Sequence, residues 1–213
     1  MTATAPAQTA VPQPVSRVFG FDRGTPIDRY YIERFLEHNK PDIRGRVMEV
    51  GSASYTKRFG ANVQQVDVLH ATLVGDLATG VGIPQSTFDC IILTQVLPFV
   101  FDVVSGVKTC HRALKPGGIV LATVPGISQI SRYDMDRWGD FWRFTDLSAR
   151  RLFDEAFLPD GGTVEVQTAG NVAVATSFLQ GLSLEEMSPE ELDPTDPDYQ
   201  VIITIRAKKG NRS

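Results

Sequence analysis

The sequence predicts an α/β fold in which a doubly wound, mostly parallel sheet carries helices on both faces. From residue 46 onward, short apolar runs typical of strands alternate with segments of helical spacing, and this order implies βαβ crossovers. The run FDCIILT at 88–94 is almost wholly apolar, as expected for a strand covered on both faces. The length of 213 residues fits a single domain.

Composition and charge narrow the possible functions. Hydrophobic residues make up 42% and charged residues 22% of the chain, which is typical of a globular protein with a sizeable core. No apolar run approaches the roughly 20 residues that span a bilayer. The net charge is −4, and segment 185–198 alone holds seven carboxylates and no base. The chain lacks the basic footprint of a nucleic-acid binder, so we expect neither nucleic acid nor membrane as a partner.

The N-terminal residues differ from the rest of the chain. Residues 1–16 consist mainly of Ala, Thr, Pro and Gln and have no charged side chain, a composition that predicts a disordered tail before a single domain at 17–213. The tail has neither the basic nor the apolar region of a signal peptide. We therefore expect a cytoplasmic protein.

The first expected element is a helix at 25–39. Thr25 reads as an N-cap followed by Pro26 at the first helical position, apolar residues follow at helical spacing, and Pro41 marks its end. Strands are then expected at 46–51, 63–68, 72–75, 88–94, 119–124, 164–168 and 200–207. Helices are expected just after Gly51, at 100–114 and at 145–157. The strand at 72–75 is the weakest, and the last two strands lack a full crossover pattern, which allows an antiparallel edge.

Segment 126–144 stands out among the connections. It spans 19 residues, shows little periodicity and holds both tryptophans. Connections of this length inside a compact domain are uncommon and usually functional. Because it follows a buried strand directly, we expect it at the carboxyl-end crevice where open α/β sheets bind ligands.

The turn after the first strand has the residues of a ligand-binding loop. In MEVGSASYTKRFG the strand ends at Gly51, and small residues lead into a helix, whose free N–H groups suit an anionic group. A dinucleotide fingerprint would need glycine where Ala53 and Thr56 stand, which disfavours a pyrophosphate. A single glycine can also serve packing alone, and both interpretations stay open at this point.

Two acids follow the next strands. Asp67 ends the second strand, 18 positions after Glu49, close to the spacing at which an acid binds ribose hydroxyls. Asp76 follows the third strand. Each acid alone could be a solvated strand end, but acids at the ends of three consecutive strands favour a shared site.

Five segments together resemble a known family. They are VMEVG, VDVLH, VGDLATGVGIP, FDCIILTQVLPFV and RALKPGGIVLATVP. In order and spacing, over residues 17–208, the chain resembles the class I S-adenosylmethionine-dependent methyltransferases of the small bacterial type 11 kind. The resemblance implies a Rossmann-like fold with a seven-stranded sheet, S-adenosylmethionine as cofactor, and methyl transfer to an oxygen or nitrogen of a small-molecule acceptor such as a sugar or natural-product intermediate.

The resemblance also implies a cofactor site at the carboxyl ends of successive strands. The residues it places there are Glu49, Gly51, Ser52, Asp67, Val68, Leu69, Asp76, Leu77, Thr94 and Gln95. The first turn would hold the methionine part, Asp67 the ribose, the next four residues of this set the adenine, and the last two would lie near the sulfonium. The chain departs from the family in the first turn, where GSASY replaces GxGxG. There Ser52 or Ser54 could supply hydroxyl donors.

The loop 126–144 supplies the expected acceptor side. The catalytic candidates are Tyr133, Asp140 and Arg143, and the substrate-binding candidates are Trp138 and Trp142. A carboxylate among aromatic side chains can acquire the raised pKa of a general base. The alternative is that WGDFWRF is a packing motif in which Asp140 pairs with Arg137 or Arg143.

The cysteines and histidines of the chain indicate neither a disulfide framework nor a metal site. Cys90 and Cys110 are isolated thiols in apolar patterns and form no disulfide framework, and the spacing of the three histidines fits no metal site. The expected partner is a small-molecule acceptor, with a homodimer left open. The rival hypothesis is a non-catalytic binding or regulatory subunit that keeps the methyltransferase fold.

Overall fold

A six-stranded sheet in the order β2-β1-β3-β4-β6-β5 forms the centre of the computed structural model, which describes residues 13–211. The strands are β1 (Gly45–Val50), β2 (Val63–Leu69), β3 (Phe88–Thr94), β4 (Leu114–Pro125), β5 (Thr163–Ala169) and β6 (Ile202–Lys208). Strands β2, β1, β3 and β4 are parallel to one another, whereas β6 is antiparallel to both β4 and β5. The expected doubly wound, mostly parallel Rossmann-like sheet is confirmed.

The sheet has one strand fewer than the seven expected. Residues 72–75 form only an isolated bridge between Leu69 and Leu73. The carbonyl of Val68 accepts hydrogen bonds from the three successive N–H groups of residues 71–73, at 3.0, 2.9 and 2.9 Å. This tight turn leaves too little extended chain for a strand, and Val74 is 86% exposed. β2 is therefore the edge of the sheet.

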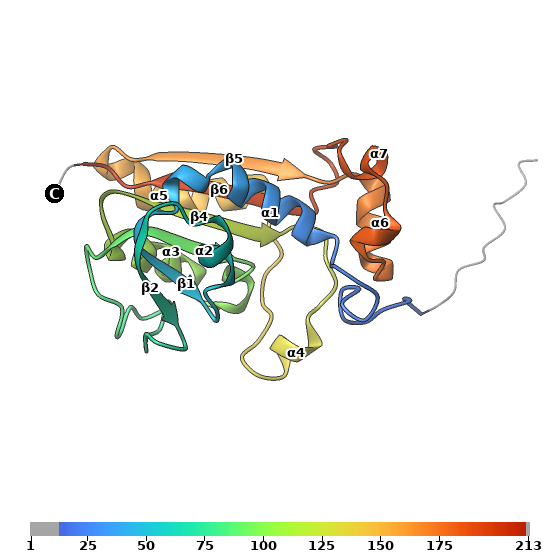
Figure 1. The fold of residues 1–213 in the computed structure, drawn as a ribbon, viewed down its shortest axis with the longest axis horizontal. Coiled ribbons are helices and arrows are strands. Elements are labelled where there is room, and N and C mark those ends of the chain that lie inside the picture. The colour runs from blue at the N-terminus through green and yellow to red at the C-terminus, as the bar shows by residue number, and fades with distance from the viewer. Residues whose placement is uncertain (1–12, 212–213) are drawn as a thin grey trace, which may run out of the picture.

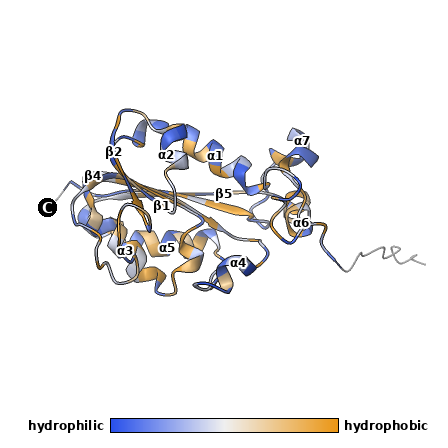
Figure 2. Ribbon diagram, turned by 60° about the horizontal axis from the view of Figure 1, so that its bottom comes forward, coloured by the Kyte–Doolittle hydropathy of each residue, from blue (hydrophilic) through white to orange (hydrophobic). Residues whose placement is uncertain are grey.

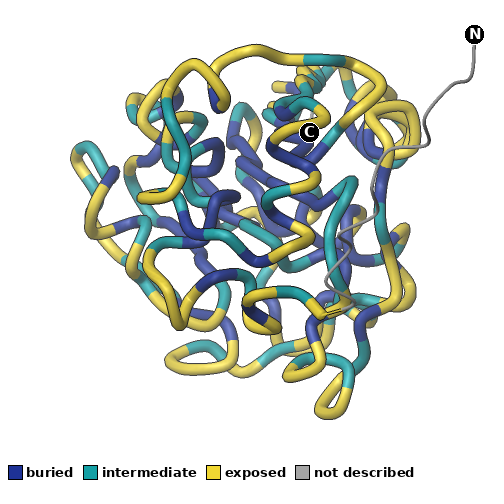
Figure 3. The backbone as a smooth tube through the Cα atoms, turned by 90° about the vertical axis from the view of Figure 1, so that its right-hand side faces the viewer, coloured by how far each residue is buried: buried dark blue, intermediate teal, exposed yellow. Residues whose placement is uncertain are grey.

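Helices cover both faces of the sheet. Helices α1 (Asp28–His38) and α2 (Ser54–Phe59) lie on one face, and α3 (Val103–Ala113) and α5 (Asp146–Phe157) on the other (Figures 1 and 2). The remaining helices are α4 (Arg132–Met135), α6 (Val172–Gln180), α7 (Pro189–Leu192) and the short 3-10 turns Lys40–Asp42, Leu97–Phe99, Leu158–Asp160 and Leu184–Glu186. Buried residues concentrate in the interior of the molecule and exposed residues at its periphery (Figure 3).

Each face of the sheet has its own apolar core. The larger core, under α3 and α5, contains Phe88, Phe153 and Phe157, and the smaller one, under α1 and α2, contains Leu36 and Cys90. Fully burying one such side chain stabilises the fold by about 1.5–3 kcal/mol. Both thiols are buried as expected, and burial raises the pKa of Cys110 to about 12.

Helix starts follow the sequence at α5 but not at α1. Thr145 forms a capping box with Ser148 at the start of α5, as its position predicts. At α1 the expected N-cap at Thr25 is wrong. The helix begins at Asp28 without a side-chain cap, because the Thr25 hydroxyl donates instead to Glu185 at 2.7 Å.

The acidic segment 185–198 anchors the N-terminal part of the domain. The Glu185 carboxylate accepts hydrogen bonds from Thr25, and Glu186 forms an ion pair with Arg23. Hydrogen bonds from Thr25 lower the pKa of Glu185 to about 2, and those from Arg23 have the same effect on Glu186. Helix α6, which the sequence did not predict, packs with α7 against the start of α1 (Figure 1).

The domain begins slightly before the expected residue 17. Most of the expected tail, residues 1–12, lies outside the described residues. Val15 and Ser16 donate backbone hydrogen bonds to the carbonyl of Gln180 at 2.8 and 3.3 Å, and Ser16 is buried. No helix in the described part of the chain is both long and apolar enough to cross a membrane.

Candidate functional site

A cavity of about 550 Å³ opens where β3 and β4 end. It is lined by the N-terminal segment 17–21, the start of α1, the turn after β3 and the loop 126–144. Among its lining residues are Phe19, Phe21, Asp28, Gln95, Asp140 and Arg143. The carboxyl ends of parallel strands are where open α/β sheets bind ligands, so the cavity is the candidate site.

The turn after β3 enters the cavity with a strained backbone. Gln95 has a φ of 57°, a left-handed conformation that costs a non-glycine residue free energy and clusters at functional sites. Its backbone N–H donates to the carbonyl of Thr123 at 2.9 Å, and its side-chain amide donates to the Thr123 hydroxyl at 3.2 Å. Thr94 and Gln95 both line the cavity.

Asp140 is buried in the loop wall and fully bonded. Its side chain is 1% exposed and accepts hydrogen bonds from both terminal nitrogens of Arg143, at 2.6 and 2.9 Å, and from the Ser131 N–H at 2.9 Å. Burial alone would raise the pKa of Asp140, but these hydrogen bonds outweigh it and lower the pKa. Arg143 is thus the partner of Asp140, while Arg137 lies over the Tyr133 ring. A carboxylate held this way is a weak proton acceptor.

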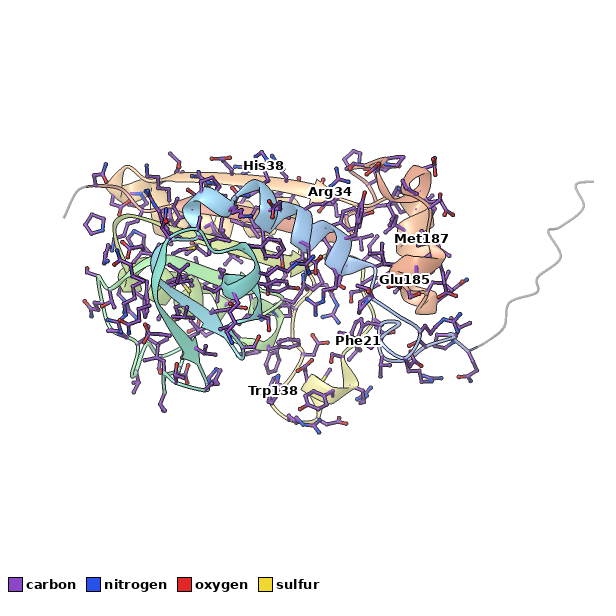
Figure 4. All side chains as sticks on the ribbon, viewed as in Figure 1. Phe21, Arg34, His38, Trp138, Glu185 and Met187 are labelled. Atoms are coloured by element: carbon purple, nitrogen blue, oxygen red, sulfur yellow. The ribbon has the colours of Figure 1, made fainter. Side chains whose placement is uncertain are left out.

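The aromatic candidates of the loop divide. Tyr133 lines the cavity. Trp138 and Trp142 do not, and they are 53% and 38% exposed. Trp142 donates its ring N–H to the carbonyl of Val100 at 3.1 Å, and Trp138 lies at the outer end of the loop (Figure 4). The structure thus places both tryptophans outside the lining of this cavity, and their substrate-binding role stays a prediction.

The turn after β1 leaves open space. Gly51 is exposed with a φ of +77°, and a Cβ added there would meet no atom within 4 Å. The Ser52 hydroxyl is also exposed, with the Ser54 hydroxyl 3.0 Å away. Glu49 in β1 pairs with Ile92 in β3, so this turn and Thr94 lie at the same edge of the sheet. A ligand can therefore approach the Gly51 backbone at this edge.

Glu49 supports this turn from inside. It is 3% exposed, and its carboxylate accepts hydrogen bonds from the Tyr55 N–H, the Thr56 N–H and the Thr56 hydroxyl, at 3.1, 2.9 and 2.7 Å. Its oxygens are therefore occupied by the start of α2. Glu49 holds the loop in place rather than offering a free acceptor.

The structure does not bring Asp67 to this edge. Its carboxylate binds the Arg46 guanidinium at 2.7 and 3.2 Å, and that guanidinium lies over the ring of Phe88 at the amino end of β3. β2 continues two residues past Asp67, to Leu69. The ribose contact of Asp67 stays a prediction, and in this structure an arginine on the neighbouring strand binds its carboxylate.

The apolar residues expected at the adenine lie in the core. Leu69 has no exposed surface, and Val68 and Leu77 are 8% and 5% exposed. The residue that emerges at the end of β2 is His70, exposed and with a φ of 70°. Asp76 is exposed, and its Oδ1 accepts the N–H groups of Ala78 and Thr79 at 2.6 and 3.2 Å.

Asp28 is the residue of the cavity that the sequence did not single out as functional. It is 8% exposed, and its Oδ1 is the one buried side-chain N or O atom within residues 13–211 that has no hydrogen-bond partner. Burial raises its pKa. The available signal was its position, because Asp28 precedes the apolar residues Tyr31 and Ile32 by three and four and shares their face of the helix.

Comparison with known families gives a match over part of the chain. Residues 41–122 match the model of a methyltransferase domain. This part of the chain is therefore similar to a methyltransferase domain. The similarity supports S-adenosylmethionine as the cofactor, and the open turn at Gly51 fits such a ligand because nothing occupies the space in front of the glycine.

Solved structures share the fold of this chain. An S-adenosylmethionine-dependent methyltransferase from Mesorhizobium loti is 17% identical with a TM-score of 0.53, covering 89% of this chain and 100% of that one. One from Archaeoglobus fulgidus is 12% identical with a TM-score of 0.52, covering 85% and 94%. The cyclase SpnF is 15% identical with a TM-score of 0.56, covering 94% and 87%. A search of curated proteins found no match.

The residues expected at the cofactor have two different environments in the structure. Gly51, Ser52, Thr94 and Gln95 border open space at the carboxyl edge, whereas Glu49 and Asp67 are bound within the fold. Bound S-adenosylmethionine would supply a methyl group on a positively charged sulfur. No three His, Cys, Asp or Glu side chains of residues 13–211 are grouped to hold a metal ion.

Proposed function

We propose that the protein transfers a methyl group from S-adenosylmethionine to an oxygen or nitrogen of a small-molecule acceptor. The observation that carries this proposal is the cavity, which begins at Thr94 and Gln95 and continues under the loop 126–144. Its volume of about 550 Å³ lies in the range of small-molecule sites. The cofactor edge and an acceptor-sized space therefore meet at the end of β3.

The proposed roles follow from which residues border open space at the carboxyl edge of the sheet. Gly51 and Ser52 would hold the methionine part of the cofactor, and Asp76 would contact the adenine. Thr94 and Gln95 would border the transferred methyl. Methyl transfer needs the acceptor atom in line with the carbon–sulfur bond, and positioning can supply much of the rate. The Asp140–Arg143 pair would fix the loop that positions the acceptor.

The acceptor class that we propose is a sugar or natural-product intermediate. The walls of the cavity carry Phe19, Phe21, Phe99 and Phe178 together with seven charged residues. Apolar walls combined with placed polar groups are typical of small-molecule sites. Such a protein would work in the cytoplasm on a free small molecule.

Calorimetry of S-adenosylmethionine binding tests the cofactor half of the proposal. Gly51→Val should weaken binding by at least about tenfold, because the branched side chain enters the open space in front of the turn. Gly161→Val is a matched control. Gly161 has a φ of +81°, close to the +77° of Gly51, and a Cβ there also meets no atom within 4 Å, so both variants carry similar backbone strain. Equal affinity in the two variants would place the cofactor elsewhere.

An assay with methyl-labelled S-adenosylmethionine and a panel of hydroxyl and amine acceptors tests the transfer itself. Label in an acceptor supports the enzyme. The alternative is a non-catalytic binding or regulatory protein, and the cyclase SpnF, with its similar fold, carries a name other than methyltransferase. Tight cofactor binding without transfer to any acceptor of the panel would favour that alternative.

A further inference from the structure

One oxygen of the buried Asp28 carboxylate, Oδ1, has no hydrogen-bond partner within residues 13–211. Its neighbour Arg29 points elsewhere, because the Arg29 guanidinium donates to the Tyr55 hydroxyl at 2.8 Å, and its Nε is 4.0 Å from Asp28 Oδ1. That distance is beyond a hydrogen bond. The side chain of Asp28 is 12% exposed and lines the cavity. The exposed part of this side chain therefore borders the space that is open to a ligand.

The other carboxylates of the cavity are engaged. Asp140 is bound by Arg143 and Ser131, and Asp134 accepts the Ser131 hydroxyl. The remaining charged groups that line the cavity are Arg17, Arg29 and Arg132. A buried carboxylate without a partner is unfavourable for folding, and perturbed groups of this kind cluster at functional sites. Asp28 is thus the carboxylate in this cavity with an acceptor atom to spare.

We infer that Asp28 binds the donor group of the acceptor, a hydroxyl or an amine, and takes up the proton that this group loses on methylation. The proton step rests on the proposed function. A bond forms between the acceptor atom and the methyl carbon, and the methyl–sulfur bond breaks with its electron pair left on sulfur. The acceptor proton passes to a carboxylate oxygen of Asp28. The positive charge on sulfur and the negative charge on Asp28 are lost together, so the step balances.

Burial supports this assignment through basicity. It raises the pKa of Asp28, whereas Arg143 and Ser131 outweigh burial and lower the pKa of Asp140. A general base is more effective when its pKa lies nearer the working pH. Of these two carboxylates, Asp28 is the better proton acceptor.

The surroundings of Asp28 define the class of acceptor. Phe19, Phe21, Phe99 and Phe178 line the same cavity, so an apolar body fits there. The end that meets Asp28 must carry a hydrogen-bond donor, because an ionised carboxylate only accepts hydrogen bonds. An anionic group at that end would be repelled. We therefore infer an acceptor with an apolar body and a hydroxyl or amine donor group that is neutral when it attacks, because a protonated amine has no lone pair for the methyl carbon.

NMR titrations of the full chain with small aromatic probes test this assignment without cofactor. Benzyl alcohol and benzylamine carry a donor, and benzyl methyl ether is a comparable probe without one. At least one donor probe should bind the wild-type chain about tenfold more tightly than the ether, the scale of one hydrogen bond to a charged group. A preference for the alcohol alone identifies a hydroxyl acceptor, and a preference for the amine alone a nitrogen acceptor.

The variant Asp28→Asn should reduce that preference to about twofold or less. Glu33→Gln in the same helix is the matched control and should keep it, because Glu33 pairs with Arg58 and does not line the cavity. The proposal is overturned if neither donor probe binds wild-type chain better than the ether, or if Asp28→Asn keeps the full preference. The wild-type comparison stands even if a variant fails to fold.

Cofactor binding is measured separately with Gly51→Val, so failure of the donor preference and failure of the methyltransferase proposal are distinguishable. A carboxyl NMR titration of Asp28 in the chain without cofactor gives a further readout. The proposal expects its midpoint above that of an ordinary aspartate. A midpoint at or below the ordinary value would overturn the proton-accepting role.

Discussion

Asp28 and Asp140 line one cavity from different walls, helix α1 and the loop 126–144, and their carboxylates differ in hydrogen bonding. They are almost equally buried, at 8% and 9% exposure. Asp140 in the loop wall accepts hydrogen bonds from Arg143 and Ser131, whereas Oδ1 of Asp28 in the helix wall accepts none. The pKa of the loop carboxylate is accordingly lowered and that of the helix carboxylate raised.

Local geometry explains this difference. Arg143 follows Asp140 by three residues in a chain that folds back on itself, so the two side chains meet. Arg29 follows Asp28 by one residue in a helix, where adjacent side chains do not face each other. In the loop 126–144, the charges of Asp140 and Arg143 hold the conformation of the loop itself. In helix α1, the Oδ1 atom of Asp28 remains without a hydrogen-bond donor. Lack of a partner, more than burial itself, marks a group that is available for chemistry.

The largest expected effect is a loss of folding stability when the Asp140–Arg143 pair in the loop 126–144 is broken. Arg143→Met leaves the Asp140 carboxylate, with its side chain 1% exposed, without its cation. Breaking a buried pair on one side should destabilise the fold by about 3 kcal/mol, measured by urea unfolding. Arg137→Met is the control, because Arg137 lies over the exposed ring of Tyr133, and should cost less than about 0.5 kcal/mol. Similar losses in both variants would mean that the buried pair does not hold the loop.

A smaller loss of folding stability is expected for a substitution in the N-terminal segment, which forms another part of the cavity wall. The buried hydroxyl of Ser16 accepts the N–H groups of Val18 and Gly20, both at 3.1 Å, and donates to Asp22. Ser16→Ala leaves these groups unpaired and should cost about 2 kcal/mol. Ser54→Ala, with an exposed hydroxyl, should change stability by less than about 0.5 kcal/mol. An unchanged melting temperature for Ser16→Ala would show that this segment is held by other contacts.

The buried strands could be predicted from the sequence more closely than the site. Strands β1, β3 and β4 lie where apolar runs between turn residues placed them, because strands covered on both faces are apolar throughout. The missing strand at 72–75 and the unpredicted helix α6 have different causes. A tight turn after Val68 removed the first, and the segment VAVATSFLQ of α6 is rich in β-branched residues, which favour strands.

The site residues depended on contacts that a sequence pattern does not contain. The spacing of Asp67 suited a ribose-binding acid, but Arg46 on the neighbouring strand takes its carboxylate. Aromatic content marked the loop correctly as a cavity wall, yet it could not tell that Tyr133 faces the cavity while Trp138 faces solvent. Asp28 looked like an ordinary first-turn acid, because its missing partner is visible only once Arg29 and Tyr55 are placed.

Removing the free carboxylate should stabilise the fold. Asp28→Asn removes a buried charge whose Oδ1 accepts no hydrogen bond, and it should add about 1 kcal/mol at pH 7. The folded-state pKa of Asp28 lies above its unfolded value, so wild-type stability falls as the pH rises from about 3.9 to the folded value and stays lowered above it. The advantage of the variant should therefore vanish below about pH 3.9.

Asp140→Asn should show the opposite pH dependence. Its folded-state pKa is lowered, so its contribution to stability is present above about pH 3.9 and is lost as the pH falls through the folded value. Thermal unfolding of both variants from pH 3 to 8 distinguishes the two walls. Parallel pH profiles for the two variants would contradict the comparison.

The smallest expected effect extends the same comparison to a third carboxylate, that of Asp67 in β2. Asp67 is bound by Arg46, so its oxygens are already engaged within the fold, like those of Asp140. Asp67→Asn should therefore leave the affinity for S-adenosylmethionine within about twofold of the wild-type value. Its cost in stability should stay near 1 kcal/mol, because the Arg46 side chain of this pair is 35% exposed. Calorimetry with Gly51→Val alongside provides the variant that must lose binding. A tenfold loss of affinity in a stable Asp67→Asn protein would mean that the cofactor draws the carboxylate away from Arg46. An ion pair within the fold would then not prevent a carboxylate from binding the ligand.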